Sequence, residues 1–284
     1  MSDFEMLTVD YRAADAPARL TRSLRDTGFA VLTGHPIAAE RIDAAYGAWA
    51  EFFAGGDKDA YMADPDTGAG YFPFRSENAK GAKAKDLKEF FHVYASGPAP
   101  AALEPETRSL YADLVNLGEE LLGWVETEMP AEAKAALQEP LAPMVQGSRH
   151  NLLRVLHYPP LAAAGEAAEP GAVRAAAHED INLLTLLVAG SAPGLEALDA
   201  AGRWHEVPCD PGMITINVGD MLEKATGGYF PSTTHRVVNP ALEADGSRYS
   251  MPMFLHPRPE VRLDAAYTAD EYLQERLREI GLKS

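Results

Sequence analysis

The chain has 284 residues, 46% of them hydrophobic, and a formal net charge of −17. This length supports a sizeable core, and the strong negative charge argues against nucleic acid as a partner. No apolar run approaches the length of a membrane span, and the acidic first residues lack the features of a secretory signal. Cys209 is the single cysteine, so no internal disulfide can form, and we expect a cytoplasmic protein without a membrane partner.

The first part of the chain, residues 1–145, is predicted to be a mixed region with several helices. Apolar residues recur at helical spacing over 16–27, 38–54 and 104–129, and each stretch ends beside a glycine or a proline. A short strand is expected over 29–32, between the first two helices. We expect this N-terminal region to pack on the core that follows it.

From residue 151 onward, short runs separated by turns are typical of a β-sandwich or barrel. The stretch 162–177 is polar and predicts a surface loop, with Arg174 in solvent. A capping box from Thr268 to Glu271 opens a last helix. The predicted fold is therefore mainly β with flanking helices packed on one side (α+β), with a core over 146–258 and a C-terminal helix in 259–284. Strands are expected over 151–158, 181–188, 195–198, 203–207, 213–217, 234–238 and 248–255.

His178 and Asp180 stand two apart at the head of an apolar run. Residues i and i+2 of a strand point to the same side, so the imidazole and the carboxylate would project together. With His235 from a different strand they would form a 2-His-1-carboxylate triad, the arrangement that suits non-haem Fe(II). The alternative is a histidine and an aspartate at a strand end that face solvent or bond to each other.

Arg248 and Ser250 repeat the same spacing further along the chain. A guanidinium and a hydroxyl on one strand face suit a carboxylate, which arginine can bind through two hydrogen bonds. A metal triad followed by such a carboxylate clamp is a site for Fe(II) and a 2-oxo dicarboxylic acid.

The sequence resembles the isopenicillin N synthase-like branch of the Fe(II)/2-oxoglutarate-dependent dioxygenases. The resemblance runs from about residue 151 to 259, with a weaker echo in the first third, and the order of the blocks makes it specific. The blocks are Arg154-Val155-Leu156-His157-Tyr158-Pro159-Pro160, His178-Glu179-Asp180, Leu183-Leu184-Thr185-Leu186-Leu187, Pro193-Gly194-Leu195, Gly202-Arg203-Trp204, Asn217-Val218-Gly219-Asp220, Thr234-His235-Arg236-Val237 and Arg248-Tyr249-Ser250.

The resemblance implies a jelly-roll (double-stranded β-helix) core that holds iron by His178, Asp180 and His235. It also implies that Arg248 and Ser250, helped by Tyr158, bind the distal carboxylate of the cosubstrate 2-oxoglutarate. Such an enzyme uses Fe(II), 2-oxoglutarate and O2, oxidises a small molecule by hydroxylation, desaturation or cyclisation, and releases succinate and CO2. Many members carry asparagine where this chain has Leu156, which affects one auxiliary cosubstrate contact.

Residues 64–98 alternate glycine, proline and aromatic residues and then become locally basic. The composition favours a solvated loop. In the family, however, this part of the chain contributes to the substrate pocket, which makes Tyr71, Phe72 and Arg75 candidate substrate-side residues. The basic residues of the stretch are Arg75, Lys80, Lys83, Lys85 and Lys88.

Three other functions remain open from the sequence. An iron oxidase of the same fold could use the Arg248 and Ser250 pair for another carboxylate and dispense with 2-oxoglutarate. A zinc hydrolase could use the histidines and the aspartate, since zinc accepts both, but it would make no use of the clamp. A non-catalytic binding barrel would not need an intact triad. The sequence defines neither the substrate nor the oligomeric state.

Overall fold

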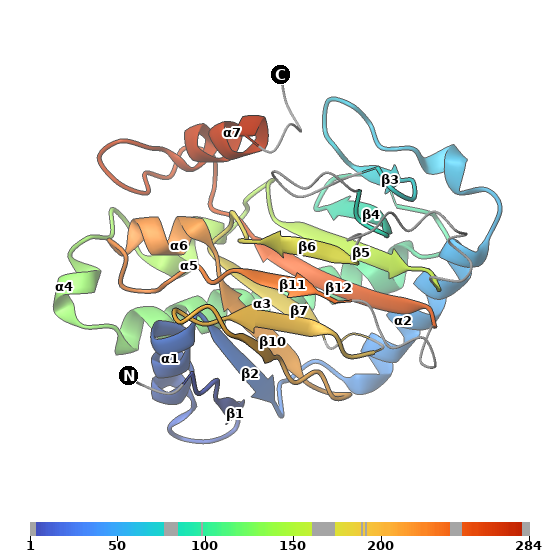
Figure 1. Ribbon diagram of the computed structural model, residues 1–284. Helices are drawn as coiled ribbons and strands as arrows, with labels where there is room; N and C mark the ends of the chain where they lie inside the picture. The colour runs from blue at the N-terminus through green and yellow to red at the C-terminus, as the bar shows by residue number, and fades with distance from the viewer. Residues whose placement is uncertain are drawn as a thin grey trace.

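Two β-sheets form the centre of the molecule in the computed structural model, which describes residues 4–76, 85–97, 99–160, 174–188, 190, 192–238 and 246–279. The large sheet has the strand order β1-β2-β10-β7-β12-β5-β4-β3, and the small sheet has the order β6-β11-β8-β9 (Figure 1). The large-sheet strands are β1 (Thr8–Asp10), β2 (Phe29–Thr33), β3 (Gly70–Phe72), β4 (Glu89–Tyr94), β5 (Leu152–Tyr158), β7 (Leu184–Val188), β10 (Ile214–Val218) and β12 (Arg248–Leu255). The small-sheet strands are β6 (Ala175–His178), β8 (Leu195–Leu198), β9 (Trp204–Glu206) and β11 (His235–Val237).

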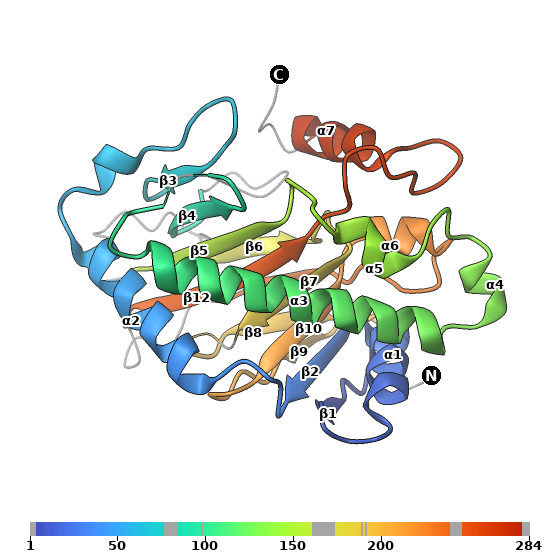
Figure 2. The same cartoon turned by 180° about the vertical axis from the view of Figure 1, so that it is seen from behind.

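Helices cover the outer face of the large sheet. Figure 2 shows α3 (Glu104–Glu128) running across this face, with α1 (Ala16–Thr27) and α2 (Ala39–Ala54) on either side of it. Gly118 lets α3 approach β12 closely, because a Cβ at this position would lie 2.0 Å from Leu255 Cδ1. The remaining helices are η1 (Lys58–Tyr61), α4 (Ala131–Lys134), α5 (Leu141–Val145), α6 (Asp220–Ala225) and α7 (Ala269–Glu279).

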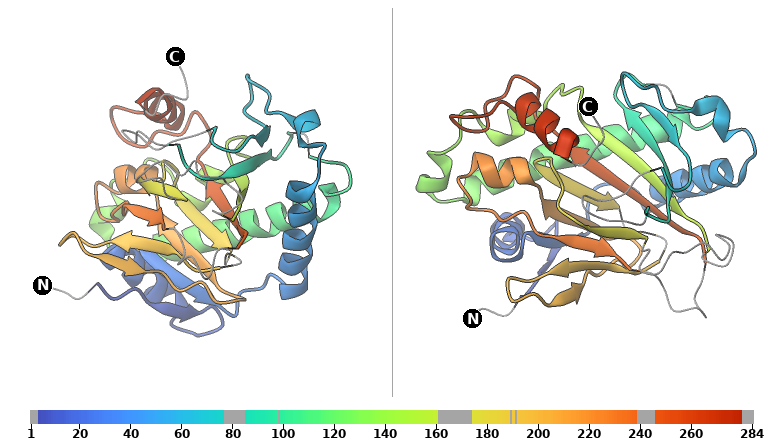
Figure 3. Two further views of the ribbon diagram at one scale, coloured as in Figure 1. Left: turned by 45° about the vertical axis from the view of Figure 1, so that its right-hand side comes forward. Right: turned by 45° about the horizontal axis from the view of Figure 1, so that its top comes forward.

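The alternation of side chains along each strand separates two environments. Met251, Met253 and Leu255 of β12 belong to the core cluster under the helices, so Arg248 and Ser250 point to the opposite, inner face. The small sheet packs over part of this inner face, as the views in Figure 3 show. Phe29 and Val31 of the large sheet form a second core cluster there with small-sheet residues Ala175, Leu195, Ala197 and Val237.

The observed elements agree with most of the predicted ones, including the helices over 16–27, 38–54 and 104–129. The solvated-loop prediction for residues 64–98 was wrong for β3 and β4, which complete one edge of the large sheet. The surface-loop prediction was also wrong at its C-terminal end, because residues 175–177 belong to β6. These strands are short and lack a clear apolar alternation, so their pairing depends on neighbours far away in the sequence.

Candidate metal centre and cosubstrate site

His178, Asp180 and His235 converge at the inner side of the small sheet. Each offers one ligand atom, and these atoms lie within 4.8 Å of one another. Asp180 Oδ1 is 3.8 Å from His178 Nε2 and 3.7 Å from His235 Nε2. These separations suit three ligands around one ion, because a metal at about 2.0–2.2 Å from each atom holds them roughly 3–4 Å apart. The described part of the chain contains one such group of potential metal ligands.

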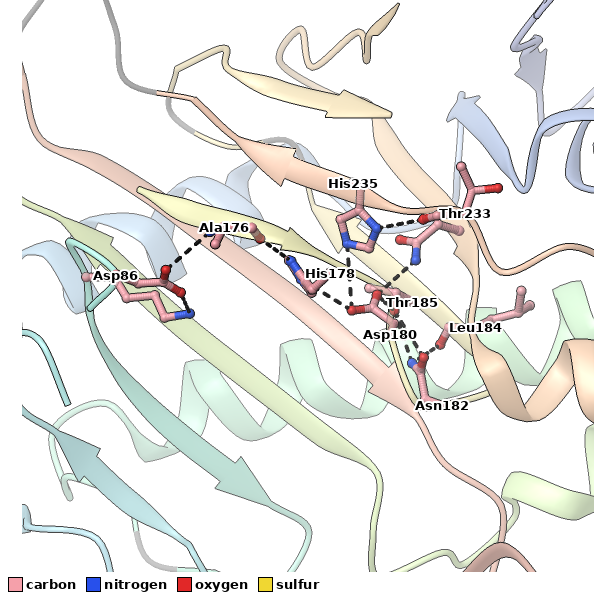
Figure 4. Close-up of polar contacts among 11 residues, drawn as sticks. Asp86, Ala176, His178, Asp180, Asn182, Leu184, Thr185, Thr233 and His235 are labelled. Atoms are coloured by element: carbon pink, nitrogen blue, oxygen red, sulfur yellow. Dashed lines mark hydrogen bonds and ion pairs between the residues drawn. The ribbon is translucent and has the colours of Figure 1, made fainter. Parts of the chain in front are cut away.

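The backbone sets the orientation of both imidazoles (Figure 4). His178 Nδ1 lies 2.8 Å from the Ala176 carbonyl oxygen, and His235 Nδ1 lies 3.0 Å from that of Thr233. A carbonyl oxygen can only accept, so each Nδ1 carries a proton, and in the neutral imidazole Nε2 then presents a lone pair. This is the tautomer that a metal-binding histidine needs, fixed from behind by a hydrogen bond.

Asp180 is held in the same way by side chains of the large sheet. Its Oδ2 accepts hydrogen bonds from Thr185 Oγ1 at 2.6 Å and from Asn217 Nδ2 at 2.8 Å. Thr185 lies on β7 and Asn217 on the neighbouring β10, where the two residues are cross-strand partners. Oδ1 therefore remains directed towards the two imidazoles. Sequence reasoning did not assign this role to Thr185 or Asn217, although both fall in blocks that carry the family resemblance.

The protonation states of the triad also suit metal binding. Desolvation and then the charge of His235 lower the pKa of His178 to about 4, and the charge of Lys88 acts in the same direction. Burial alone would raise the pKa of Asp180, but the two histidines and its hydrogen bonds outweigh burial and lower it. Near neutral pH, His178 is thus uncharged and Asp180 is ionised, as metal ligands must be. The triad opens on the His178 side, because this side chain is 40% exposed whereas that of Asp180 is 6% exposed.

The structure gives a different reason for the convergence from the one that the sequence suggested. His178 is the last residue of β6, and Asp180 lies in the turn before β7, so the two are not neighbours on one strand. His235 lies on β11 directly opposite His178 in the antiparallel pairing of β6 with β11. The two histidines are thus brought together by strand pairing, and Asp180 by the turn that crosses to the large sheet.

Arg248 and Ser250 lie buried on the inner face of β12. Arg248 is 1% exposed, its Nε donates to the Ala192 carbonyl oxygen at 2.9 Å, and its Nη1 has no hydrogen-bond partner among the described residues. Gly190 leaves room for the guanidinium, since a Cβ there would lie 3.1 Å from Nη2. Tyr158 is the cross-strand partner of Arg248, and Arg248 Cζ lies 5.2 Å from the Tyr158 ring centroid.

The triad and the clamp face the same interior. Thr185, which binds Asp180, is the cross-strand partner of Phe254 on β12. Phe254 alternates in phase with Ser250 and Arg248, so all of them point to the inner face. The clamp therefore lies on the same face of the large sheet as Thr185, which holds the metal-ligand candidate Asp180.

Two buried cations near this site were not recognised from the sequence. Arg174 was expected in solvent but is 2% exposed; it donates to the Gly246 carbonyl oxygen, and its Cζ lies 6.0 Å from the Tyr158 ring centroid. Lys88 is 7% exposed and forms a 2.9 Å ion pair with Asp86, whose other oxygen accepts the Ala176 N–H (Figure 4). Both residues lie in polar stretches, and the sequence carried no signal for their burial.

The substrate-side candidates Tyr71 and Phe72 lie on opposite faces of the large sheet. Phe72 pairs with Phe90, which pairs with Leu156, which pairs with Ser250, so this row shares the inner face. Tyr71 points to the helix side, where its hydroxyl donates to Glu89. The expectation that Tyr71 faces the substrate is therefore wrong, because adjacent residues of a strand point to opposite sides.

Arg75, the third candidate, is partly buried at a backbone turn. It adopts a positive φ of 62°, and its amide donates to the Lys88 carbonyl oxygen at 3.1 Å. Its Cζ lies 5.5 Å from the Phe74 ring centroid. The basic residues Lys80 and Lys83, also singled out from the sequence, lie outside the described residues.

Comparison with known proteins identifies the family. Residues 149–257 match the 2OG-Fe(II) oxygenase superfamily, and residues 1–113 match the non-haem dioxygenase in morphine synthesis N-terminal region. The solved structure of a Shewanella oneidensis protein described as an oxygenase is 47% identical, covers 98% of this chain and 100% of that one, and gives a TM-score of 0.88. A Caulobacter crescentus protein described as a member of the 2OG-Fe(II) oxygenase family is 34% identical over 97% of this chain and 99% of its own, with a TM-score of 0.81.

The chain belongs to the 2OG-Fe(II) oxygenase superfamily. A 2-oxoglutarate-dependent dioxygenase of Monascus ruber is 29% identical over 267 residues, which cover 84% of this chain and 77% of that protein. A full-length Neurospora crassa protein, solved in complex with alpha-KG, is 22% identical, covers 95% of each chain and has a TM-score of 0.78, a likeness that shows the fold. The predicted jelly-roll core is confirmed.

The enzyme is accordingly a non-haem Fe(II)/2-oxoglutarate-dependent dioxygenase that uses Fe(II), 2-oxoglutarate and O2. This decides against the zinc hydrolase and the non-catalytic barrel. None of the helices in the described ranges is both long and apolar enough to cross a membrane.

Proposed function

We propose that His178, Asp180 and His235 bind Fe(II), and that Arg248, Ser250 and Tyr158 bind the distal carboxylate of 2-oxoglutarate while a small organic molecule is oxidised. The bound metal would supply O2 activation coupled to oxidation of the cosubstrate to succinate and CO2. The residues of the chain bind and orient the metal, the cosubstrate and the substrate, and they exclude water from the site.

The donor set of the triad supports the metal assignment. Two imidazoles and one carboxylate favour non-haem Fe(II) and leave coordination positions for other ligands. The two Nδ1 atoms and Asp180 Oδ2 are already hydrogen-bonded, which leaves one ligand atom of each residue directed inward. The exposed side of His178 provides the direction from which ligands can approach.

The unpaired Nη1 of Arg248 is the observation that most strongly supports the cosubstrate assignment. A buried charged donor without a partner costs free energy, so it is retained where a ligand supplies the acceptor. The guanidinium can bind a carboxylate through two parallel hydrogen bonds, and the nearby Ser250 hydroxyl can add a third. Packing of Arg248 against the Tyr158 ring holds the guanidinium in a water-poor setting.

The apolar side chains on the inner face beside the clamp indicate that part of the substrate is apolar. Phe72 stacks on Phe90 with ring centroids 4.6 Å apart, and Leu156 and Tyr158 continue the same apolar cluster. Leu156 has no polar atom on its side chain, so it cannot make the contact that asparagine makes in other members. We propose that Phe72 and Arg75 face the substrate, where Phe72 supplies an apolar contact and Arg75 supplies a positive charge.

The test is the dependence of succinate formation on 2-oxoglutarate in Arg248→Met. Loss of a charged hydrogen bond, worth about 1.5–3 kcal/mol, should raise KM for 2-oxoglutarate about 10- to 100-fold. Arg236→Met is the matched control, because Arg236 also lies on a strand but pairs with Glu196 and packs on Trp204. The control should leave this KM unchanged. An unchanged KM in Arg248→Met would refute the assignment of the clamp.

A further inference from the structure

A buried polar network lies on the helix-covered face of the large sheet. At its centre is Glu89 of β4, which is 5% exposed. Glu89 Oε2 accepts hydrogen bonds from Lys58 Nζ at 2.8 Å and from the Tyr71 hydroxyl, and Oε1 lies 2.7 Å from His157 Nδ1. His157 Nε2 in turn lies 3.0 Å from Ser247 Oγ. The network thus links η1, β3, β4 and β5 to the residue that precedes β12.

The network contacts the chain on both sides of Arg248. Ser247 immediately precedes Arg248, and Tyr249 follows it. His157 reaches Ser247 by the hydrogen bond and stacks on Tyr249 with ring centroids 4.7 Å apart and planes 12° from parallel. His157 also immediately precedes Tyr158, the cross-strand partner of Arg248. One imidazole therefore contacts both chain neighbours of Arg248 and is itself the chain neighbour of Tyr158.

The charge state of Glu89 makes this arrangement well defined. Burial alone would raise the pKa of Glu89, but hydrogen bonds from His157, Lys58 and Tyr71 outweigh burial and lower it. The ionised carboxylate is an acceptor only, so His157 Nδ1 carries the proton that it donates to Glu89. His157 Nε2 shares the other hydrogen bond with the Ser247 hydroxyl, as acceptor when the imidazole is neutral. Hydrogen bonds centred on a buried, ionised carboxylate hold the backbone that carries their partners in place.

We propose that Glu89, His157 and Ser247 position the Arg248 guanidinium for the distal carboxylate of 2-oxoglutarate. The inference rests on the proposed function, in which Arg248 is the carboxylate-binding residue. His157 lies on the opposite face of the sheet from the clamp, so it acts through the backbone and is a positioning residue. The same network accounts for Tyr71, which buttresses Glu89.

The experiment measures 2-oxoglutarate binding to the Fe(II)-loaded enzyme without oxygen, by the visible charge-transfer band. His157→Asn should raise the Kd for 2-oxoglutarate about tenfold, and Ser247→Ala should raise it about threefold, as expected for outer partners of a binding group. Pyruvate is a 2-oxo acid without a distal carboxylate, so its Kd should not change in either variant. Ser247 is exposed, so Ser247→Ala provides a folded protein if His157→Asn does not.

His205→Asn is the matched control, since His205 Nε2 also lies 2.8 Å from a buried carboxylate, that of Asp199, but in the small sheet. It should leave both Kd values unchanged. The inference is overturned if neither His157→Asn nor Ser247→Ala weakens 2-oxoglutarate binding. It is also overturned if the Kd values for 2-oxoglutarate and pyruvate rise by the same factor, because the whole site would then be disturbed. If Arg248→Met still raises KM for 2-oxoglutarate as expected, the proposed function holds even when either of these results overturns the positioning role.

Discussion

The metal triad and the carboxylate clamp face the same interior but are built differently. In the triad, the polar atoms that do not point at the metal position have partners: two backbone carbonyls for the imidazoles, and Thr185 and Asn217 for Asp180. In the clamp, Arg248 is 1% exposed and its Nη1 lacks a partner in the described part of the chain. In the proposed site, the triad is thus complete before a metal binds, whereas the clamp would be completed by its ligand.

This difference indicates where binding energy is used. A preorganised metal site loses little conformational freedom on binding, so its affinity depends on the ligands and on the groups that orient them. In the clamp, burial of the positive charge costs free energy, and the binding of an anion offsets this cost. Substitutions in the triad should therefore affect metal binding first, and substitutions in the clamp should affect 2-oxoglutarate affinity first.

The largest effect is expected for Asp180→Ala. Removal of the one carboxylate ligand leaves two imidazoles, so Fe(II) affinity should fall at least about a hundredfold and turnover should be lost. Fe(II) titration and succinate release measure the two quantities. Glu196→Ala, a carboxylate on β8 that pairs with Arg236, is the control and should bind Fe(II) normally. Tight Fe(II) binding by Asp180→Ala would place the metal elsewhere.

A smaller effect is expected for Thr185→Val, which keeps the side-chain volume but removes the hydrogen bond to Asp180. Groups that orient metal ligands typically contribute about 10- to 100-fold in metal affinity, and Asn217 still holds the same oxygen, so we expect about tenfold weaker Fe(II) binding. The Kd for 2-oxoglutarate at saturating Fe(II) should stay within about twofold of the wild-type value, because Thr185 does not belong to the clamp. A selective loss of 2-oxoglutarate affinity instead would contradict the separation of the two regions.

Ser250→Ala should do the reverse and weaken 2-oxoglutarate alone. One neutral hydrogen bond is worth about 0.5–1.5 kcal/mol, so KM for 2-oxoglutarate should rise about two- to tenfold. Fe(II) affinity should not change, and titration of the metal in the absence of 2-oxoglutarate checks this. Equal loss of both affinities would mean that triad and clamp form one unit.

The smallest effect is expected for a substitution outside both the triad and the clamp, at the start of α7. Thr268 Oγ1 accepts the Glu271 N–H at 3.3 Å, and Glu271 Oε2 accepts the Thr268 N–H at 2.8 Å, which is the predicted capping box of α7. Thr268→Ala should lower the free energy of unfolding by about 0.5–1 kcal/mol, measured by thermal denaturation. The Fe(II) and 2-oxoglutarate affinities should remain those of the wild type. A change in either would show that α7 contributes to the site.

Short motifs in the sequence were sufficient to propose the residues of the triad and the clamp, because their chemistry needs particular side chains at close spacing. The support for these residues was not visible, since it comes from strand register. Asn217 reaches Asp180 because β10 lies beside β7, and His157 lies behind Arg248 because β5 lies beside β12. Tyr71 was misassigned for the same reason: once the segment was read as a loop, nothing distinguished its orientation from that of Phe72.

The most direct test of the proposed metal and cosubstrate site is the visible spectrum of the protein with Fe(II) and 2-oxoglutarate under anaerobic conditions. The proposed site should give a charge-transfer band that saturates at one 2-oxoglutarate per chain, is absent in His178→Ala, and requires a much higher 2-oxoglutarate concentration in Arg248→Met. A band of unchanged intensity and midpoint in both variants would contradict it, because neither the proposed metal site nor the proposed clamp would then be the place where the two ligands meet.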